Sequence, residues 1–284
     1  MFKAIIKYCL PLGFFRLKEM LFNNKPEFEG TYETFDQATG ASKSEDEWNN
    51  KNWTENQLKK IRGFNELFGN YKKDNLVNFS SLGVNFGPFM LLMNLMSMNK
   101  DVVKILDFGG GTGLLYYSCM CNAINPNKIE WLVCDNNKLA ELGKKHINCD
   151  YSKIKYVNDF KDAKYDILLI SSTLHYIENY IEVLRNLLRY TPNVVHLERL
   201  HAGSNTKNYI SLQRQGNLKI PVVNIELSDI TSLLKDFGYK LVYKANNENE
   251  VYDNESFSDE LARDKRINFS INLTFIHSST TNLL

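Results

Sequence analysis

The sequence predicts an α/β fold built around a seven-stranded, mostly parallel sheet. From Asp101 onward, short apolar segments alternate with segments of helical character, a pattern typical of parallel strands covered by helices on both faces. The apolar segment 102–107 leads into a glycine turn over 109–113, after which a helix is expected. Near the end of the chain, 269–275 alternates between apolar and polar residues and favours an antiparallel last strand beside 241–243.

Each predicted strand is short and rich in Val, Ile, Leu or aromatic residues. The strands are expected at 102–107, 129–135, 154–157, 165–171, 193–197, 239–243 and 268–277. The segment 245–265 is rich in Asn and Glu, so we expect a mobile loop between the last two strands.

We expect two regions, an N-terminal helical extension over 1–100 and one cofactor-binding domain over 101–284. Within the extension, apolar residues recur at helical spacing and predict helices over 57–68 and 85–98. A chain of this length can bury one sizeable core, which suits a single elaborated domain.

The extension also contains FEGTYETFDQA, from Phe28 to Ala38, which predicts a turn at Gly30 followed by a short helix. Two tryptophans, Trp48 and Trp53, stand in the polar stretch after it. They either anchor the extension on the core or form a lid over a binding site.

Composition excludes some classes of partner. The chain has 34 Lys and Arg against 33 Asp and Glu, a formal net charge of +1. With so little net charge there is no overall field to attract a polyanion, so we expect no nucleic-acid partner. The five cysteines lack paired C-x-x-C spacing, which predicts neither a disulfide framework nor a metal site and favours a reducing, cytoplasmic compartment.

The first 22 residues are mostly apolar and carry only basic charges before Glu19. Lys7, Pro11 and Arg16 interrupt the segment, which is too short to span a bilayer, and no small-residue cleavage site follows it. Two alternatives stay open. The segment packs on the domain as a short helix pair, or it lies on the anionic inner face of the cytoplasmic membrane.

The strongest functional signal is ILDFGGGTG, from Ile105 to Gly113. Gly109, Gly111 and Gly113 let the backbone turn tightly and approach a nucleotide-like ligand, and the next helix begins with unpaired N–H groups. A dinucleotide-binding turn has the spacing G-x-G-x-x-G. Counted from Gly109, the third glycine position is occupied by Leu114.

Asp107 stands at the end of the strand that precedes these glycines. A carboxylate at this place repels a pyrophosphate and attracts an ammonium or sulfonium cation. S-adenosyl-L-methionine (SAM) carries both cations, so SAM is the predicted cofactor.

Acids at the next two strand ends extend this prediction. Asp135 lies 22 residues beyond Gly113, where a carboxylate can accept hydrogen bonds from both ribose hydroxyls, unless it caps the next helix instead. After the third strand, Asp159 is placed to accept from the adenine amine and Phe160 to stack on the ring. An ordinary turn is the alternative there.

The fourth strand ends in a run of hydroxyl residues that begins at Ser171. In an open parallel sheet this edge borders the ligand crevice, so Ser171 is expected in the cofactor site. His175 is the candidate general base, because a neutral imidazole can take the proton of a hydroxyl acceptor. The alternative is that His175 packs against its neighbours Tyr176 and Ile177.

After the fifth strand, a long segment over 202–228 is expected to be a functional loop. Arg199, His201 and Gln213 are candidates to bind the hydroxyls or the carboxylate of an acceptor. Each of the three is otherwise a solvated polar side chain.

With these residues in view, the chain resembles the class I SAM-dependent methyltransferases over roughly residues 101–277, chiefly through ILDFGGGTG. This resemblance implies a Rossmann-like seven-stranded sheet with an antiparallel last strand. More narrowly, the chain resembles a bacterial family of methyltransferases often encoded among surface-polysaccharide genes. That likeness rests on FEGTYETFDQA, ISSTLHYIENY and the segment 199–213.

The narrower resemblance implies O-methylation of a sugar hydroxyl in lipopolysaccharide or capsule biosynthesis, with a glycan or sugar precursor as the substrate. It also makes Tyr32, within FEGTYETFDQA, a candidate substrate contact. Two positions depart from the family pattern. The family more often has glutamine where His175 stands, and the residues 198–201 match its arginine segment only loosely.

Two other functions stay open at this point. An NAD(P)-dependent oxidoreductase is opposed by Leu114 and by the predicted antiparallel strand, and binding of NADH would distinguish it. A methyltransferase-like protein that binds the cofactor or a partner without turnover is compatible with the sequence, because the base is not identified. The oligomeric state is also open.

Overall fold

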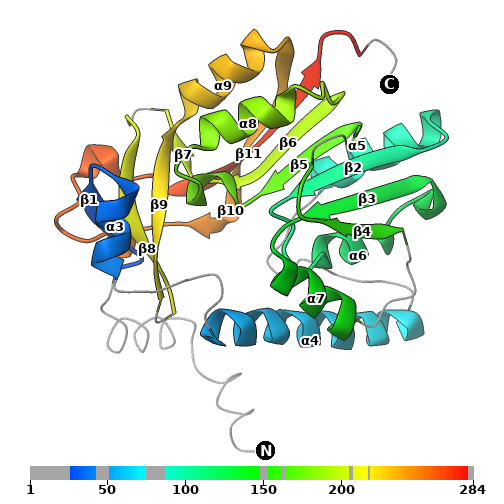
Figure 1. Ribbon diagram of the computed structural model, residues 1–284, viewed down its shortest axis with the longest axis horizontal. Helices are drawn as coiled ribbons and strands as arrows, with labels where there is room; N and C mark the ends of the chain where they lie inside the picture. Colours follow the sequence, from blue (N-terminus) through cyan, green and yellow to red (C-terminus); the bar gives the residue numbers. More distant parts are fainter. Residues whose placement is uncertain are drawn as a thin grey trace, which may run out of the picture.

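The computed structural model describes residues 26–42, 51–74, 87–147, 153–160, 164–204, 207–216 and 218–280. The first 22 residues and Trp48 lie outside these ranges, so the alternatives for them stay predictions. In the described part, the chain forms a larger sheet, a smaller second sheet and the helices that cover them (Figure 1).

The larger sheet has seven strands in the order β10-β11-β6-β5-β2-β3-β4. The strands are β2 (Val103–Phe108), β3 (Ile129–Cys134), β4 (Ile154–Val157), β5 (Ile167–Ser171), β6 (Val194–Leu200), β10 (Tyr239–Val251) and β11 (Phe269–His277). From β4 to β6 all neighbours pair in parallel, whereas β11 is antiparallel to both β6 and β10. All seven predicted strands are confirmed, and the antiparallel last strand lies between β6 and the edge strand β10.

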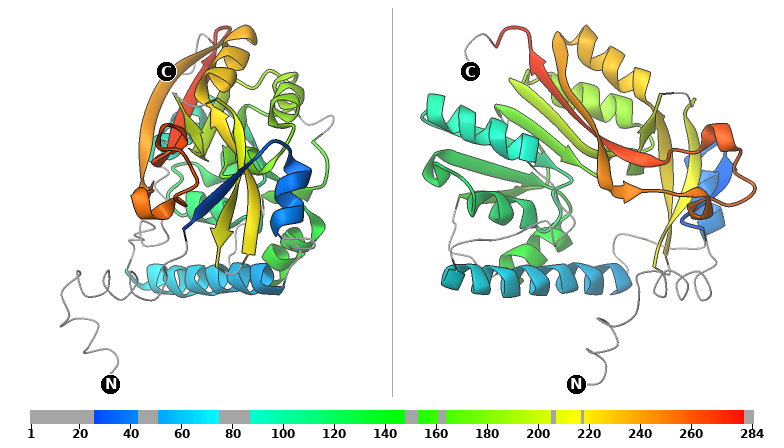
Figure 2. Two further views of the ribbon diagram at one scale, coloured as in Figure 1. Left: turned by 90° about the vertical axis from the view of Figure 1, so that its left-hand side faces the viewer. Right: turned by 180° about the vertical axis from the view of Figure 1, so that it is seen from behind.

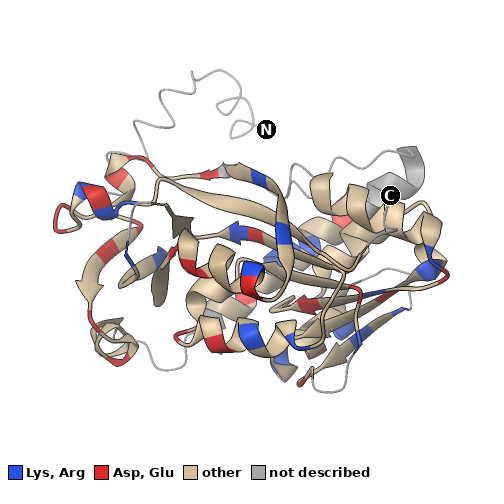
Figure 3. Ribbon diagram, turned by 90° about the horizontal axis from the view of Figure 1, so that it is seen from above, with Lys and Arg blue, Asp and Glu red and all other residues tan. Residues whose placement is uncertain are grey.

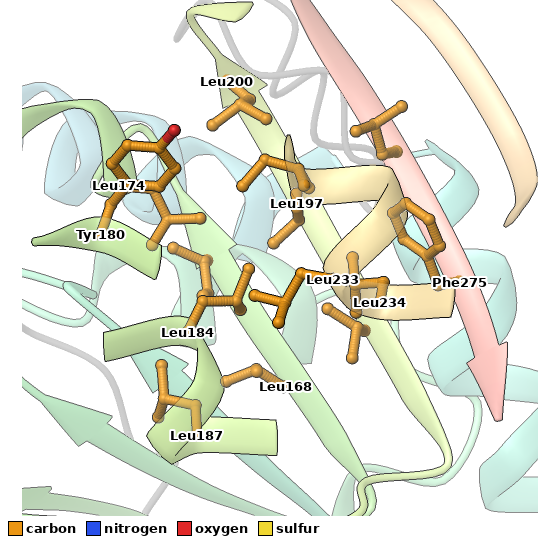
Figure 4. Packing of buried hydrophobic residues seen from close by; sticks show 14 of the residues in the cluster. Leu168, Leu174, Tyr180, Leu184, Leu187, Leu197, Leu200, Leu233, Leu234 and Phe275 are labelled. Carbon is orange, nitrogen blue, oxygen red and sulfur yellow. The ribbon is translucent and has the colours of Figure 1, made fainter. Parts of the chain in front are cut away.

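One face of this sheet is covered by α8 (Tyr180–Leu188) and α9 (Leu227–Asp236). Figure 4 shows leucines of both helices facing β5, β6 and β11, among them Leu184, Leu233 and Leu234. Their side chains are at most 6% exposed. Burial of each such side chain stabilises the folded state by about 1.5–3 kcal/mol and so fixes the position of these strands.

The opposite face packs on α5 (Gly87–Asn99) and α6 (Leu114–Met120). Trp131 of β3 is fully buried there, with its ring 5.8 Å from both Phe89 and Tyr116. Because both faces of the sheet are covered, the central strands are mostly apolar, and the first four residues of β5 form a continuous apolar run.

The remaining helices flank the sheet. The long α4 (Lys51–Asp74) contains the predicted helix 57–68 and runs along one side of the molecule beside α7 (Asn137–His146) in Figures 1 and 2. Asn65 Nδ2 donates to the carbonyl of His146 at 2.8 Å. The short 3-10 turns are η3 (Pro126–Lys128), η4 (Leu174–Tyr176), η5 (Asn254–Ser256) and η6 (Arg263–Lys265).

The second sheet has the order β1-β8-β9-β7. Its strands are β1 (Phe28–Tyr32), β8 (Tyr209–Gln215), β9 (Leu218–Glu226) and β7 (Ala202–Gly203). The prediction of a loop over 202–228 is therefore wrong. Val222, Val223 and Ile225 of β9 are buried, so this segment is a strand because it can bury its apolar side chains against the core.

The strand β1 comes from FEGTYETFDQA, where only a turn and a helix were predicted. The helix is confirmed as α3 (Phe35–Ser42). Gly30 has φ of +71° and lies where the register between β1 and β8 shifts, so the predicted turn is a bulge within a strand. The second sheet thus joins part of the predicted extension to part of the predicted cofactor domain.

The prediction of a loop over 245–265 is wrong in its first part, because β10 continues to Val251 beside β11. Figure 2 shows β10 reaching from the larger sheet toward the second sheet. Among the described residues, no helix is long and apolar enough to cross a membrane. Basic and acidic residues are intermixed along the elements in Figure 3.

Candidate active site

A cavity of about 1130 Å³ lies at the carboxyl ends of β2, β3, β5 and β6, next to the second sheet. This is the edge of a parallel sheet at which ligands bind in α/β folds. Nine of the predicted site residues line the cavity: Asp107, Gly109, Gly111, Asp135, Ser171, His175, Arg199, His201 and Gln213.

 Gly113, which was also predicted as a site residue, does not line the cavity, whereas its neighbour Leu114 does.

The glycine turn has the tight geometry that the sequence predicts. Gly109, Gly111 and Gly113 have φ of +75°, +60° and +78°, values that residues with a Cβ rarely adopt. A Cβ at Gly111 would meet no heavy atom within 4 Å, so the loop is open at this point. By contrast, a Cβ at Gly113 would lie 2.7 Å from Ile154 and Tyr156, so this glycine serves the packing of the turn on β4.

Asp107 is only 1% exposed at the end of β2. Its Oδ2 accepts a hydrogen bond from Trp131 Nε1 at 3.1 Å, whereas its buried Oδ1 has no hydrogen-bond partner among the described residues. Burial raises the pKa of Asp107 to about 7. A buried carboxylate oxygen without a donor is costly, and a cationic ligand group would complete it.

Gly110 is a site residue that sequence reasoning missed. A Cβ at this position would lie 2.5 Å from Cγ and Oδ2 of Asp107, so only glycine allows the carboxylate to sit beside the loop. The signal in the sequence was the run of three glycines over 109–111, of which only Gly109 and Gly111 were predicted to belong to the site.

Asp135 follows β3 and joins it to the glycine turn. Its Oδ2 accepts from the backbone N–H of Gly111 at 2.7 Å, and its Oδ1 accepts from that of Asn136 at 2.6 Å. The cap of α7 is Asn136, whose side chain accepts from Leu139 N–H at 3.0 Å. Asp135 therefore does not cap the helix, and each of its oxygens keeps a lone pair for a ligand.

The cavity reaches the end of β4 through Asn158. Asp159 is exposed, and the Phe160 ring packs edge-on against Phe108 and Tyr190, at 5.8 and 6.3 Å between ring centroids. Neither residue is part of the described cavity wall. The adenine roles of Asp159 and Phe160 stay predictions.

His175 lies in the cavity wall within η4 and is 4% exposed. Its Nδ1 accepts from the backbone N–H of His201 at 3.5 Å, which places the proton of the neutral ring on Nε2. Burial, and then the nearby His201 and Arg199, hold the pKa of His175 well below its usual range. A base role for His175 stays a prediction, and it requires Nδ1 to leave its present donor.

Arg199 is held in an unusual backbone conformation, with φ of +50°. Its backbone N–H donates to Asn272 Oδ1 at 2.8 Å, which ties it to β11. The guanidinium lies 3.4 Å from Ser171 Oγ and 3.5 Å from Glu250 Oε1. Ser171 and Arg199 thus meet in the cavity wall, as predicted from their places at neighbouring strand ends.

His201 is buried, and its ring stacks on Phe28 at 4.7 Å. Its Nε2 lies 2.8 Å from Asn224 Oδ1, and the amide nitrogen of Asn224 donates to Ser211 Oγ and to the Tyr209 carbonyl. These bonds make Nε2 the donor in the neutral ring. Burial lowers the pKa of His201 to about 4.

Gln213 belongs to a chain of hydrogen bonds along the cavity wall. Gln215 Nε2 donates to the Tyr176 hydroxyl at 2.8 Å, and this hydroxyl donates to Gln213 Oε1 at 2.6 Å. Gln213 Nε2 then donates to Glu27 Oε1 at 2.9 Å. The side chains come from β8, η4 and the residues before β1, which pairing of the second sheet brings together.

Tyr32 is placed elsewhere. It lines a smaller pocket beside Glu29 and Ser258, outside the described wall of the large cavity. Its role as a substrate contact stays a prediction. The wall of the large cavity contains several residues that sequence reasoning missed: Glu27, Gln57, Lys60, Gln215, Glu250 and Tyr252. It also contains Tyr176 and Trp53, the latter one of the two tryptophans predicted to anchor the extension or to cover a binding site. Among the described residues, no group of three or more His, Cys, Asp or Glu is arranged to hold a metal ion.

Glu198 gives a pH-dependent prediction. Its side chain is 3% exposed, and burial raises its pKa to about 8 from an ordinary 4.5. Ionising this carboxyl in the folded state therefore costs on the order of 5 kcal/mol. Its folded pKa is raised, so stability is greatest below the unfolded pKa and is lost as the pH rises through 8. In Glu198→Gln, the free energy of unfolding is expected to fall less between pH 5 and 9. Urea denaturation of both proteins between pH 5 and 9 measures this free energy. Equal pH dependence in the variant and the wild type would contradict the prediction.

The sequence matches no protein-family model and no curated protein. The structure is similar to that of magnesium protoporphyrin IX methyltransferase from Synechocystis PCC 6803 with bound SAM, at a TM-score of 0.50 and 15% identity, over 87% of this chain and 100% of that one. It is also similar to a SAM-dependent methyltransferase from Methanosarcina mazei, at a TM-score of 0.43 and 12% identity, over 63% and 93% of the two chains. The chain has the α/β Rossmann-like fold of the class I SAM-dependent methyltransferases.

Proposed function

We propose that this protein transfers the methyl group of SAM to a hydroxyl of a sugar, in the biosynthesis of a surface glycan such as lipopolysaccharide or capsule. The observation that carries the cofactor is the buried Asp107 carboxylate, which has an oxygen without a donor next to the open turn at Gly111. In a class I methyltransferase fold, this is the combination that a cationic nucleoside cofactor would complete.

The residues around the turn fit SAM. Asp107 and the glycine loop would hold its methionyl part, and Asp135 would accept from its ribose hydroxyls. Asp159 with Phe160 would contact the adenine, next to Asn158 in the cavity wall. When bound, SAM supplies an electrophilic methyl group. This chain's own contribution is to hold donor and acceptor in near-attack geometry and to exclude water.

A hydroxyl-rich acceptor is supported by the polar end of the same cavity. Arg199, Gln213, Gln215, Glu27 and Glu250 present both donors and acceptors there, which is what vicinal hydroxyls require. The resemblance to methyltransferases encoded among surface-polysaccharide genes favours a sugar over other polar acceptors. A precursor of the glycan in the cytoplasm is the expected substrate.

Two measurements test this proposal. Calorimetry should detect binding of S-adenosylhomocysteine (SAH) to the full chain, and radiolabelled SAM should transfer methyl to glycan extracted from cells that lack the gene. Absence of SAH binding by the folded protein would refute SAM as the cofactor. Binding without any labelled glycan would remove the sugar acceptor and favour a protein that binds cofactor without turnover.

The ribose assignment gives a separate prediction. Asp135→Ala removes a charged acceptor of hydrogen bonds, which is worth about 2 kcal/mol, so SAH affinity is expected to fall about 30-fold. The same change also frees the N–H of Gly111, so circular dichroism and the melting temperature should be recorded as controls for folding. Unchanged affinity in a folded variant would refute a ribose contact.

A further inference from the structure

We propose that Glu27 is the general base that takes the proton from the acceptor hydroxyl, an inference that rests on the proposed function. Glu27 lines the polar end of the cavity, just before β1. Its backbone is fixed on β8, because the N–H of Arg214 donates to the Glu27 carbonyl at 2.6 Å and Arg214 Nε donates to the Pro26 carbonyl at 3.2 Å.

The hydrogen-bond chain along the wall orients the carboxylate. Tyr176 donates to Gln213 Oε1, which turns the amide nitrogen of Gln213 toward Glu27. Glu27 Oε1 must therefore accept the hydrogen bond from Gln213, so this row of hydrogen bonds keeps Oε1 unprotonated. The other oxygen, Oε2, has no hydrogen-bond partner among the described residues and is available to an acceptor hydroxyl.

The surroundings make Glu27 a stronger base than an exposed glutamate. Burial is the larger cause that raises its pKa above the ordinary 4.5, and the Glu250 carboxylate adds to it, while the bond from Gln213 opposes both. A pKa closer to neutral improves proton transfer at physiological pH.

Other side chains at this end of the cavity are less suited to the role. His175 Nδ1 already accepts from His201, and Nε2 of His201 is bound to Asn224. Nδ1 of His201 is enclosed by protein. Glu250 is paired with Arg199.

The proposed step is balanced. As the acceptor oxygen forms its bond to the methyl carbon, the bond from that carbon to sulfur breaks and its electron pair leaves with SAH. The hydroxyl proton passes to Glu27 Oε2, from which it is released to solvent after the methylated product leaves.

The test uses the full chain, radiolabelled SAM and glycan extracted from cells that lack the gene. Glu27→Gln is expected to lower kcat about 100-fold or more while SAH affinity is unchanged. Glu27→Gly should be equally slow, and added formate should restore part of its turnover. Glu33→Gln, an exposed glutamate on the same segment, is the control and should retain wild-type kcat.

A second variant separates a base from a structural residue. Gln213→Leu removes the hydrogen bond that lowers the pKa of Glu27, so the acidic limb of the kcat profile should move to higher pH. Carbon-13 NMR of the Glu27 carboxyl, in the absence of acceptor, should show a matching rise of its titration midpoint.

The outcomes separate the two proposals. If wild-type protein fails to bind SAH or to methylate the glycan, the proposed function is overturned. If wild type is active and Glu27→Gln turns over at the same rate, or formate fails to restore Glu27→Gly, only the base role is overturned.

Discussion

Asp107→Asn is expected to stabilise the folded protein at pH 8 and to weaken its binding of SAH. Burial raises the pKa of Asp107 to about 7 from an ordinary 3.8, so ionising this carboxyl in the folded state costs about 4 kcal/mol. Asparagine has nearly the same shape and can still accept from Trp131 Nε1, but it carries no charge to be desolvated.

The stabilisation should depend on pH in a defined way. Because the folded pKa is raised, the wild type loses stability as the pH rises from about 4 through 7. The difference in free energy of unfolding between Asp107→Asn and wild type should grow from about 2 kcal/mol at pH 5 to about 4 kcal/mol at pH 8. Urea denaturation at these two pH values measures the difference. A variant less stable than wild type at pH 8 would contradict it.

Binding should change in the opposite direction. A carboxylate that faces a ligand cation contributes about 1.5–3 kcal/mol, so Asp107→Asn is expected to lower SAH affinity at least about tenfold. In wild type, affinity should rise with pH as Asp107 ionises near pH 7. Calorimetry of both proteins at pH 6 and 8 measures this, and equal affinities at pH 8 would argue against a cation beside Asp107.

Gly110→Ala is expected to abolish measurable SAH binding, with a loss of at least about 100-fold in affinity. The added Cβ would lie 2.5 Å from the Asp107 carboxylate, which cannot retreat because it is buried and bonded to Trp131. The glycine turn must shift instead, and Asp107 and Gly111 then lose their relative positions. Calorimetry with SAH measures the loss.

Gly63→Ala is the matched control, because a Cβ at Gly63 meets no heavy atom within 4 Å and the residue lies within α4. Alanine in a helix interior is favoured over glycine by about 1 kcal/mol, so this variant should be slightly more stable and bind SAH normally. Normal SAH binding by Gly110→Ala would show that the loop tolerates the shift.

The part of the cavity wall proposed to hold the cofactor could be predicted from the sequence because its signals are local. Asp107, Gly109 and Gly111 lie within one strand and one turn, and Asp135 ends the next strand in the chain. The order of a parallel α/β sheet brings such strand ends to one edge. The seven strands were predictable for the same reason, since each is an apolar run between polar turns.

The part of the wall proposed to bind the acceptor could be predicted only in part. Arg199, His201 and Gln213 were candidates, but their partners were not, because these residues meet only through pairing of distant segments. Glu27 and Gln213 are joined by the pairing of β1 with β8, and Glu250 arrives on the far end of β10. No local pattern marks these pairs, and the segment that forms β8 and β9 was predicted to be a loop.

The sequence by itself determined the larger sheet, its antiparallel last strand and the glycine turn with its acid, because periodicity and spacing act within short windows of the chain. Only the tertiary structure decided that Gly110 is required beside Asp107, that Asn136 rather than Asp135 caps α7, and which side chains face Glu27. Each outcome depends on burial and on a partner from another element, which local sequence patterns do not record. Trp131 fixes the Asp107 carboxylate, Gly111 binds the Asp135 carboxylate, and Gln213 reaches Glu27 from the second sheet.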